Sequence, residues 1–256
     1  MRAPASGRVG GVIGFLIGFL AGGFGALVGL GGGVIMVPLL VSWARLDQHR
    51  AHGTSLMAVA GTALVGGVSY ALGGSVDYLA AALLTVTAMM TARLGARYTR
   101  KLDARSLRRI FGSFLILTAF LLPFKKQLPH VAAGGAGALS WVVLLGAGGL
   151  AGFLSGLLGI GGGTVMVPAL VLGAGEPQQL AQGTALMAMI LPSLIGAYTH
   201  GRMGHIDRRI APGLLLGIVL GAFSGGQVAL GIPEGILRWI FAAVLLWTGL
   251  RYLRRR

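Results

Sequence analysis

Two glycine-rich segments of this sequence are candidates for binding a small anion. The first, Gly31–Pro38, reads Gly-Gly-Gly-Val-Ile-Met-Val-Pro, and it recurs 130 residues later as Gly-Gly-Gly-Thr-Val-Met-Val-Pro over Gly161–Pro168. Consecutive glycines interrupt a helix, and the short apolar helix that follows presents unpaired backbone N–H groups and a partial positive charge. Two such helix starts that face each other would form an anion site without a buried lysine or arginine. The candidate binding residues of the two segments are Gly31, Gly32, Gly33, Val34, Gly161, Gly162, Gly163 and Thr164.

These glycines also have a structural interpretation. Gly14, Gly18 and Gly22 recur at four-residue spacing, which lets membrane helices approach closely. Three successive glycines before a short helix are harder to explain by packing, because backbone unwound at membrane depth needs protein or water as a hydrogen-bond partner. We therefore expect a transporter to have a polar, water-accessible cavity at the two segments, whereas a simple membrane anchor would pack them tightly.

A second repeated motif adds polar side chains after each glycine segment. The stretch 52–55 reads His-Gly-Thr-Ser, and its counterpart 182–185 reads Gln-Gly-Thr-Ala. Hydroxyl, amide and imidazole groups are suited to carboxylate or sulfonate oxygens. The alternative is that each threonine only caps the start of a helix. The candidate binding residues of this motif are His52, Thr54, Ser55, Gln182 and Thr184.

Titratable groups are few within the apolar runs. No aspartate or glutamate lies deep in any of them, although proton- or sodium-coupled carriers often place one there. Asp77 and Asp207 precede predicted helices and are expected to be N-caps. Tyr70 and His200 share one repeat position near the end of a span, where we expect them at the membrane interface. The alternative is that His200, His205 and Asp207 form a cluster that handles protons.

The sequence offers little to support an enzyme, a metal protein or a cofactor-dependent protein. It has no cysteine, no His-Glu-x-x-His sequence and no Ser/His/Asp set with a supporting motif. The glycine segments lack the Lys-Ser/Thr ending of a phosphate-binding loop and the glycine spacing of a dinucleotide site. We therefore expect no catalytic residue, no metal site and no cofactor.

Composition places the chain in a membrane. Hydrophobic residues make up 55% of its 256 residues and charged residues only 11%, compared with about 25% charged residues in soluble domains. The mean hydropathy is +0.83. The net charge of +15 lies in a few loops and at the ends, where the positive-inside rule accounts for it. The lipid bilayer is therefore an expected partner, and nucleic acid is not.

Two halves of five apolar segments each are expected. The first half is 10–124 and the second is 139–252, with an inter-repeat linker over 125–138. The second segment of each half is too short to cross a hydrocarbon core of about 30 Å, so each glycine-rich pair is either a broken helix or a re-entrant hairpin. The expected segments are 10–30, 33–44, 52–72, 77–96, 107–124, 139–159, 163–174, 181–200, 210–229 and 236–252.

Loop charges predict that the two halves are inserted in opposite directions. The Arg45–Arg50 loop carries two arginines, whereas its counterpart Gly175–Leu180 carries none. The Gly73–Val76 loop is uncharged, whereas its counterpart Met203–Ile206 lies beside three arginines. Because basic loops face the cytoplasm, both termini are expected there. The expected fold is all-α: a polytopic transmembrane bundle of two inverted-topology repeats with eight to ten membrane segments, as in alternating-access transporters.

The paired motif resembles that of the sulfite exporter TauE/SafE family of bacterial and archaeal permeases. The resemblance rests on Gly31–Pro38 and Gly161–Pro168, each followed by Gly-Thr-x-Leu-Met, and it extends over about residues 10–252. It implies a multi-pass transporter of the cell (inner) membrane, and named members of the family are linked to export of sulfite or organosulfur anions. His52 stands against Gln182 in the repeat, so the two half-sites are not chemically equal.

The expected function is that of a permease that moves a small anion by alternating access around a site near the membrane midplane. Export of sulfite or of a sulfonate or similar organosulfur anion is the favoured form. The alternatives are a carrier for another small anion and a non-transport membrane anchor or assembly protein. The sequence leaves the substrate, the direction, the coupling ion and the oligomeric state open, a homodimer included.

Overall fold

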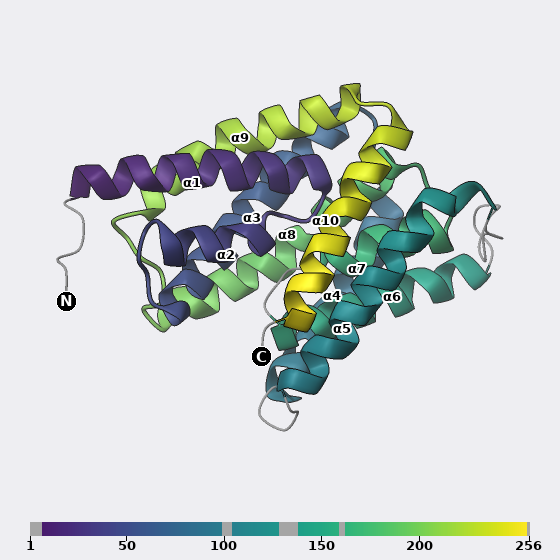
Figure 1. Ribbon diagram of the computed structural model, residues 1–256, viewed down its shortest axis with the longest axis horizontal. Helices are drawn as coiled ribbons and strands as arrows, with labels where there is room; N and C mark the ends of the chain where they lie inside the picture. The colour runs from purple at the N-terminus through teal and green to yellow at the C-terminus, as the bar shows by residue number, and fades with distance from the viewer. Residues whose placement is uncertain (1–6, 99–103, 128–137, 159–161, 255–256) are drawn as a thin grey trace.

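A computed structural model describes residues 7–98, 104–127, 138–158 and 162–254, and over these ranges the chain forms helices and no strand (Figure 1). The ten predicted segments all coincide with helices. The first half contains α1 (Gly7–Val28), α2 (Gly33–Ser42), α3 (Gln48–Leu72), α4 (Tyr78–Tyr98), α5 (Ala104–Leu121) and the 3-10 helix η1 (Leu122–Gln127). The second half contains α6 (Ala138–Leu158), α7 (Gly163–Pro168), the π-helix η2 (Ala169–Gly173), α8 (Gln178–Arg202), α9 (Ala211–Gly231) and α10 (Glu234–Arg254).

Five of the described helices, α1, α3, α8, α9 and α10, are long and apolar enough to cross a membrane. This confirms a helical membrane protein, although some boundaries differ from those predicted. Helix α3 begins at Gln48 rather than at 52, because Asp47 caps it by accepting a hydrogen bond from the Arg50 N–H at 3.0 Å. The predicted segment 163–174 divides after Pro168, whose ring removes a helical N–H donor, and continues as η2.

Helices of one half pack mainly on helices of the other half. Helix α1 lies along α9, and α4 lies against α6. These two contacts are equivalent, because α1 corresponds to α6 and α4 to α9 in the repeat. Two further large contacts join counterparts directly, α3 with α8 and α5 with α10, and α3 also packs on α9 as α4 does on α8. Figure 1 shows α1 and α9 side by side along one edge of the molecule.

Glycines bring these paired helices into backbone contact. A Cβ atom at Gly18 of α1 would collide with the carbonyl oxygen of Leu214 of α9, and one at Gly14 would lie 2.6 Å from the Ile210 oxygen. In the equivalent α4–α6 contact, a Cβ at Gly152 would collide with the Ala88 oxygen. The packing interpretation of the Gly14–Gly22 series is therefore confirmed.

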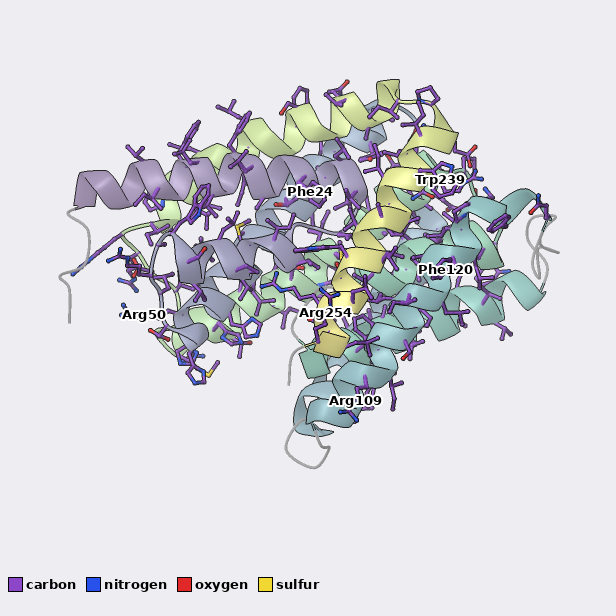
Figure 2. The ribbon with its side chains drawn as sticks, viewed as in Figure 1. Phe24, Arg50, Arg109, Phe120, Trp239 and Arg254 are labelled. Carbon is purple, nitrogen blue, oxygen red and sulfur yellow. The ribbon has the colours of Figure 1, made fainter. Side chains whose placement is uncertain are left out.

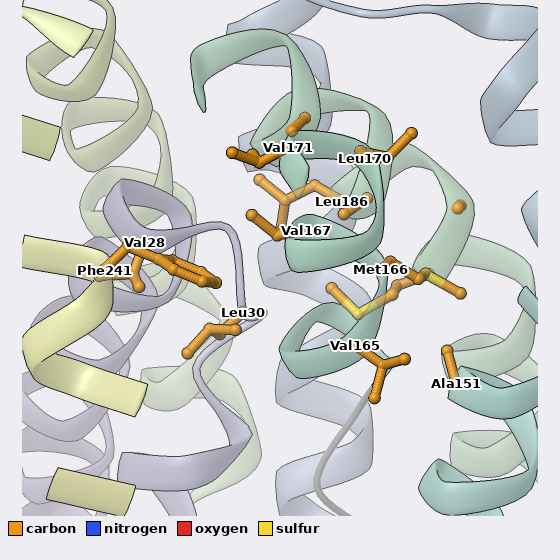
Figure 3. Packing of buried hydrophobic residues seen from close by; sticks show 14 of the residues in the cluster. Val28, Leu30, Ala151, Val165, Met166, Val167, Leu170, Val171, Leu186 and Phe241 are labelled. Atoms are coloured by element: carbon orange, nitrogen blue, oxygen red, sulfur yellow. The ribbon is translucent and has the colours of Figure 1, made fainter. Parts of the chain in front are cut away.

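The hydrophobic core surrounds the two glycine segments. Figure 3 shows Leu30, on the segment after α1, opposite the side chains of α7, with Phe241 of α10 beside Val28. Val165 and Val167 of α7 are at most 3% exposed. The interrupted backbone is thus enclosed by side chains from both halves. Of the predicted linker 125–138, residues 128–137 lie outside the described part of the chain.

Candidate functional site

The first glycine segment turns the chain back along α1. Gly29, Gly31 and Gly32 have φ angles of +74°, +72° and +79°, in the left-handed region that favours glycine. A Cβ atom at Gly32 would lie only 2.5 Å from the carbonyl oxygen of Ala21. Helix α2 then starts at Gly33, and the N–H groups of its first turn begin to donate to the Gly32 oxygen. The sequence prediction of a helix start after the glycines is confirmed here.

The second glycine segment has a different backbone conformation. Gly162 precedes α7 with φ −78°, in the right-handed helical region, although its counterpart Gly32 is left-handed. It faces Ala151 of α6, which is the repeat counterpart of Ala21. Gly161, also a predicted site residue, lies outside the described residues. Nearly identical local sequences therefore pack on equivalent helices with unequal backbone conformations at the residue before the short helix.

The structure brings the two glycine segments into contact. A Cβ atom at Gly163 would lie 2.6 Å from the Gly29 carbonyl oxygen and 3.0 Å from the Leu30 Cα. Met189 of α8 bridges them: its Sδ accepts a hydrogen bond from the Gly163 N–H at 3.1 Å, and its Cε is 3.2 Å from the Cβ position of Gly31. The backbone of one segment thus touches that of the other, with a thioether between them.

The described binding residues predicted in both segments are mostly buried. Gly31, Gly32, Gly33, Gly162, Gly163 and Thr164 are buried, and Val34 is half-buried. They pack against protein and do not line the open, water-accessible cavity that we expect of a transporter. Such tight packing is what the membrane-anchor alternative predicts, and in a transporter it corresponds to a conformation that is closed at this site.

Two of the predicted binding residues each have a buried side-chain atom without a hydrogen-bond partner. Thr164 Oγ1 lies in the first turn of α7, and its residue is 2% exposed. Gln182 is fully buried, packs directly on Gly29, and leaves its Nε2 unpartnered. These two atoms are free to donate hydrogen bonds to a polar species at the glycine segments. The sequence identified both residues.

The remaining predicted residues lie farther along α3 and α8. Thr54 Oγ1 accepts a hydrogen bond from the Asp207 N–H at 3.1 Å, and Thr184 Oγ1 accepts one from the Asp77 N–H at 2.9 Å. Each threonine thus holds the loop of the opposite half, so the alternative that it caps its own helix is wrong. Ser55 is buried beside Thr54, and His52 is half-buried one turn from the start of α3.

Tyr70 is not at the membrane interface as predicted. It is fully buried, and its hydroxyl donates to Gln182 Oε1 at 2.8 Å and lies 3.2 Å from the Ala26 carbonyl oxygen. A buried phenol needs such partners, and Gln182 supplies one from the opposite half. Through Gln182, Tyr70 is linked to the first glycine segment.

Only one of the two aspartates is an N-cap. Asp77 Oδ1 accepts from the Ala80 N–H at 2.9 Å, which confirms its prediction. Helix α9 begins at Ala211, four residues after Asp207, so the prediction for Asp207 is wrong. Its Oδ1 accepts instead from the Arg209 N–H at 2.9 Å within the preceding turn.

A buried ionic cluster was missed by sequence reasoning. Lys125 of η1 is 7% exposed, and its Nζ donates to the Glu176 carbonyl oxygen at 2.5 Å and to Glu234 Oε1 at 3.4 Å. Arg238, one turn into α10, pairs with the same carboxylate. Burial lowers the pKa of Lys125, while Glu234 opposes that shift. The only sequence signal was the isolated Lys125–Lys126 pair, in a linker that is otherwise without basic residues apart from His130.

Comparisons with known proteins agree with this architecture. The family model described as sulfite exporter TauE/SafE matches residues 2–122 and 144–256. A probable membrane transporter protein of Bacillus subtilis, YunE, is 30% identical over 251 residues, covering 86% of this chain and 88% of its own length. A second from the same organism, YdhB, is 34% identical over 41% of this chain and 43% of its own length.

A probable membrane transporter protein of Xylella fastidiosa is 35% identical over 46% of this chain and 45% of its own length. No solved structure matches the chain. The family model covers both glycine segments, and the first of these relatives spans most of the chain. The chain therefore belongs to the sulfite exporter TauE/SafE family, whose curated relatives are described as probable membrane transporters.

Proposed function

We propose that this protein is a permease that carries a small oxyanion, in the favoured form sulfite or an organosulfonate, out of the cell. The substrate binds between the two glycine segments and is reached alternately from either side of the membrane. The described structure is the closed form of this cycle. Family membership supports transport, and the particular anion rests on the chemistry of the site.

The observation that carries the proposal is the pair of unpartnered buried donors at the glycine segments. Thr164 Oγ1 and Gln182 Nε2 both donate hydrogen bonds, and oxyanions accept them. Gly163 supplies a backbone N–H whose acceptor here is only a thioether, a weak acceptor that an anionic oxygen would replace. The donors come from α7 and α8, and Gly29 of the first half packs on Gln182.

Binding needs no buried lysine or arginine. The N-terminus of α2 contributes a fraction of a positive charge, worth about 0.3–1 kcal/mol when exposed and up to about 2 kcal/mol when partly buried. Hydrogen bonds to a charged acceptor add about 1.5–3 kcal/mol each. Two or three such hydrogen bonds, less the cost of immobilising the anion, correspond to a dissociation constant of millimolar to micromolar order. A carrier must also release its substrate, and this range permits it.

Alternating access is supported by the equivalence of the interhelical contacts. The α1–α9 and α4–α6 pairs correspond in the repeat, and loops at equivalent positions carry opposite charge patterns. We place the ends that carry Arg50, Arg109 and Arg254 in the cytoplasm (Figure 2). Single cysteines introduced at Trp43 and Gly173 test this, since the chain has no native cysteine. Labelling of both from the same side would contradict inverted insertion.

The direct test is efflux from proteoliposomes loaded with labelled sulfite, sulfoacetate, sulfate or acetate. We expect saturable flux of sulfite or sulfoacetate in the wild type. Thr164→Val should weaken apparent affinity, because it keeps the side-chain shape and removes the unpartnered hydroxyl. Thr118→Val is the matched control, because the Thr118 hydroxyl is satisfied by its own helix at Phe114 O. No flux of any of the four anions would contradict the proposal.

A further inference from the structure

Four histidines converge at one end of α3 and α8. The His200 and His205 rings are 5.5 Å apart between centroids, with their Nδ1 atoms 3.4 Å apart. The His49 ring is 5.8 Å from that of His205. His52 lies within electrostatic range of both His49 and His200. We call His49, His52, His200 and His205 the histidine cluster; it joins the start of α3, the end of α8 and the turn that follows.

We call the end of the bundle at the histidine cluster one mouth and the repeat-equivalent end, at Tyr70 and Ser75, the opposite mouth. The opposite mouth has the same local backbone conformation but different side chains. The His205 N–H donates to the His200 oxygen at 3.0 Å, and in the repeat the Ser75 N–H donates to the Tyr70 oxygen at 2.9 Å. Gly204 and its counterpart Gly74 both have left-handed φ angles, +73° and +66°. The counterparts of His49, His52, His200 and His205 are Gln179, Gln182, Tyr70 and Ser75.

At the opposite mouth, the counterpart of each imidazole in the histidine cluster is a side chain that stays neutral near physiological pH. At the opposite mouth the buried pair Tyr70–Gln182 is held by a 2.8 Å hydrogen bond. The equivalent positions in the cluster are His200 and His52. One mouth is therefore closed by a contact insensitive to protons, and the other by imidazoles, which are able to bind protons.

The surroundings favour a proton as the ligand of the cluster. Helix α3 brings Asp47 and Arg50, α8 brings Arg202, and the turn after α8 brings Asp207, Arg208 and Arg209, with Arg45 on the preceding loop. Both carboxylates face Arg50, at 4.0 Å for Asp47 and 3.5 Å for Asp207. Within the described ranges no carboxylate pairs with a histidine, and no set of three histidines and carboxylates is arranged to hold a metal ion.

We propose that the histidine cluster is a proton-binding site that opens the arginine-rich mouth of the transporter. This inference rests on the proposed transport function. The facing Nδ1 atoms of His200 and His205 share a contact that needs one donor and one acceptor. A proton on the acceptor nitrogen makes both nitrogens donors, which breaks this contact, and it adds a positive charge among arginines and the histidines of α3. Separation of α3 from α8 and the turn after it moves His49 and His52 away from His200 and His205 and relieves the repulsion between the two groups, while the opposite mouth stays closed.

A matched pair of cysteines tests the proposal. Ala51 of α3 and its counterpart Ala181 of α8 are both fully buried, one beside each mouth. Ala51→Cys and Ala181→Cys are each labelled with a membrane-impermeant maleimide in inside-out and right-side-out vesicles, from about pH 7.5 to about pH 5.5, around the ordinary imidazole pKa of about 6.5. Rates are divided by those of the denatured variant at the same pH, which removes the titration of the thiol itself.

We expect normalised labelling of Ala51→Cys to rise about tenfold on acidification, the factor that corresponds to one pKa unit of preferential proton binding to the open form. Ala181→Cys should not respond. In the background His49→Gln, His200→Tyr and His205→Ser, which copies the opposite mouth and retains His52, the response of Ala51→Cys should vanish. His200→Tyr alone should at least halve it and serves if the triple variant does not fold.

The outcomes separate the two hypotheses. A pH-independent Ala51→Cys, or an equal response of Ala181→Cys, overturns the proton site while leaving anion flux in proteoliposomes to support transport. A response that persists in the histidine variants also overturns it, since another group must then titrate. A proton-dependent opening without flux of any anion retains the proton site and contradicts the proposed substrate.

Discussion

The hydroxyl of Thr54 accepts a hydrogen bond from the backbone N–H of Asp207 at 3.1 Å, across 153 residues of sequence. Exchange of each residue for its repeat counterpart gives the bond between Thr184 and Asp77, at 2.9 Å. One interaction therefore occurs twice, once at each mouth, and each time it ties a long central helix to a loop of the other half. The two mouths differ in the side chains around them, but both contain this hydrogen bond.

Removal of either threonine hydroxyl should destabilise the protein. Thr54→Val leaves the Asp207 N–H buried without an acceptor, which costs about 1–3 kcal/mol. Thr184→Val should cost a similar amount at the other mouth, and the two effects should add because the sites share no partner. Thermal unfolding in detergent measures both. Thr54→Ser retains the hydroxyl and is the control; equal losses for valine and serine would show that packing, and not the hydrogen bond, is responsible.

Alanine substitutions on α1 should have opposite effects at Gly18 and Gly11. A Cβ at Gly18 collides with the Leu214 carbonyl of α9, so Gly18→Ala must push the helices apart. At Gly11 no atom lies within 4 Å of the Cβ position, and Gly11→Ala should stabilise by up to about 1 kcal/mol through helix propensity. Unfolding temperatures in detergent compare the two. A tolerated Gly18→Ala would contradict the close α1–α9 contact.

The segments and their order follow from the sequence because they depend on local patterns. Apolar runs and glycine interruptions marked the ten α-helices of the described ranges, mostly to within a few residues, and the repeat exposed the equivalent positions. The partners do not follow in the same way. That Thr54 meets Asp207 and Tyr70 meets Gln182 depends on how α3 packs against α8, which no local pattern specifies.

The residues of the candidate site could be predicted from the sequence, but the contacts that they make could not. Thr164 and Gln182 stood out because they repeat beside the glycines, and both prove to be buried donors without partners. The hydrogen bond from the Gly163 N–H to Met189 could not be predicted, because Met189 reads as an ordinary apolar residue of a span. His200 and His205 are close in sequence, whereas His49 and His52 join them only through the α3–α8 contact.

The two glycine segments should differ in their tolerance of alanine. Gly32→Ala should impair folding or transport, because its φ is +79° and the Cβ would lie 2.5 Å from the Ala21 oxygen. Gly162→Ala should retain transport, because its φ is −78° and its nearest neighbour is the flexible end of Met166, at 3.1 Å. Leucine should abolish transport at either position. Membrane yield and anion flux measure these effects, and equal behaviour of the two alanine variants would contradict the inequality.

Glu176 should make stability fall as the pH rises. Burial raises its pKa, and the Asp77 carboxylate raises it further. Between its ordinary pKa and the raised one, the folded protein binds more protons than the unfolded chain, so the free energy of unfolding decreases with increasing pH and the loss persists above this range. Glu176→Gln should thus stabilise at neutral pH, by about 0.5 kcal/mol given partial exposure, and should match the wild type in acid.

Thermal unfolding against pH measures the effect of Glu176→Gln. The control is Glu234→Gln, which should destabilise at neutral pH because the carboxylate of Glu234 pairs with Lys125 and Arg238. Lys125 contacts Glu176 through its backbone oxygen, so this bond survives in Glu176→Gln. A Glu176→Gln variant less stable than the wild type at neutral pH would contradict the assignment.

Met189 should compete with the substrate for the Gly163 N–H. Its Sδ accepts that hydrogen bond at 3.1 Å in the closed form, so an anion must displace it. Met189→Val copies the counterpart Val59 and is too short to reach; the free protein should lose about 1–3 kcal/mol from the orphaned donor. The anion should then raise the unfolding temperature more in the variant than in the wild type. Met189→Leu, of similar size but without sulfur, should behave likewise if the hydrogen bond is decisive, and a smaller anion-induced shift in both variants would show that Met189 supports the bound state instead of excluding it.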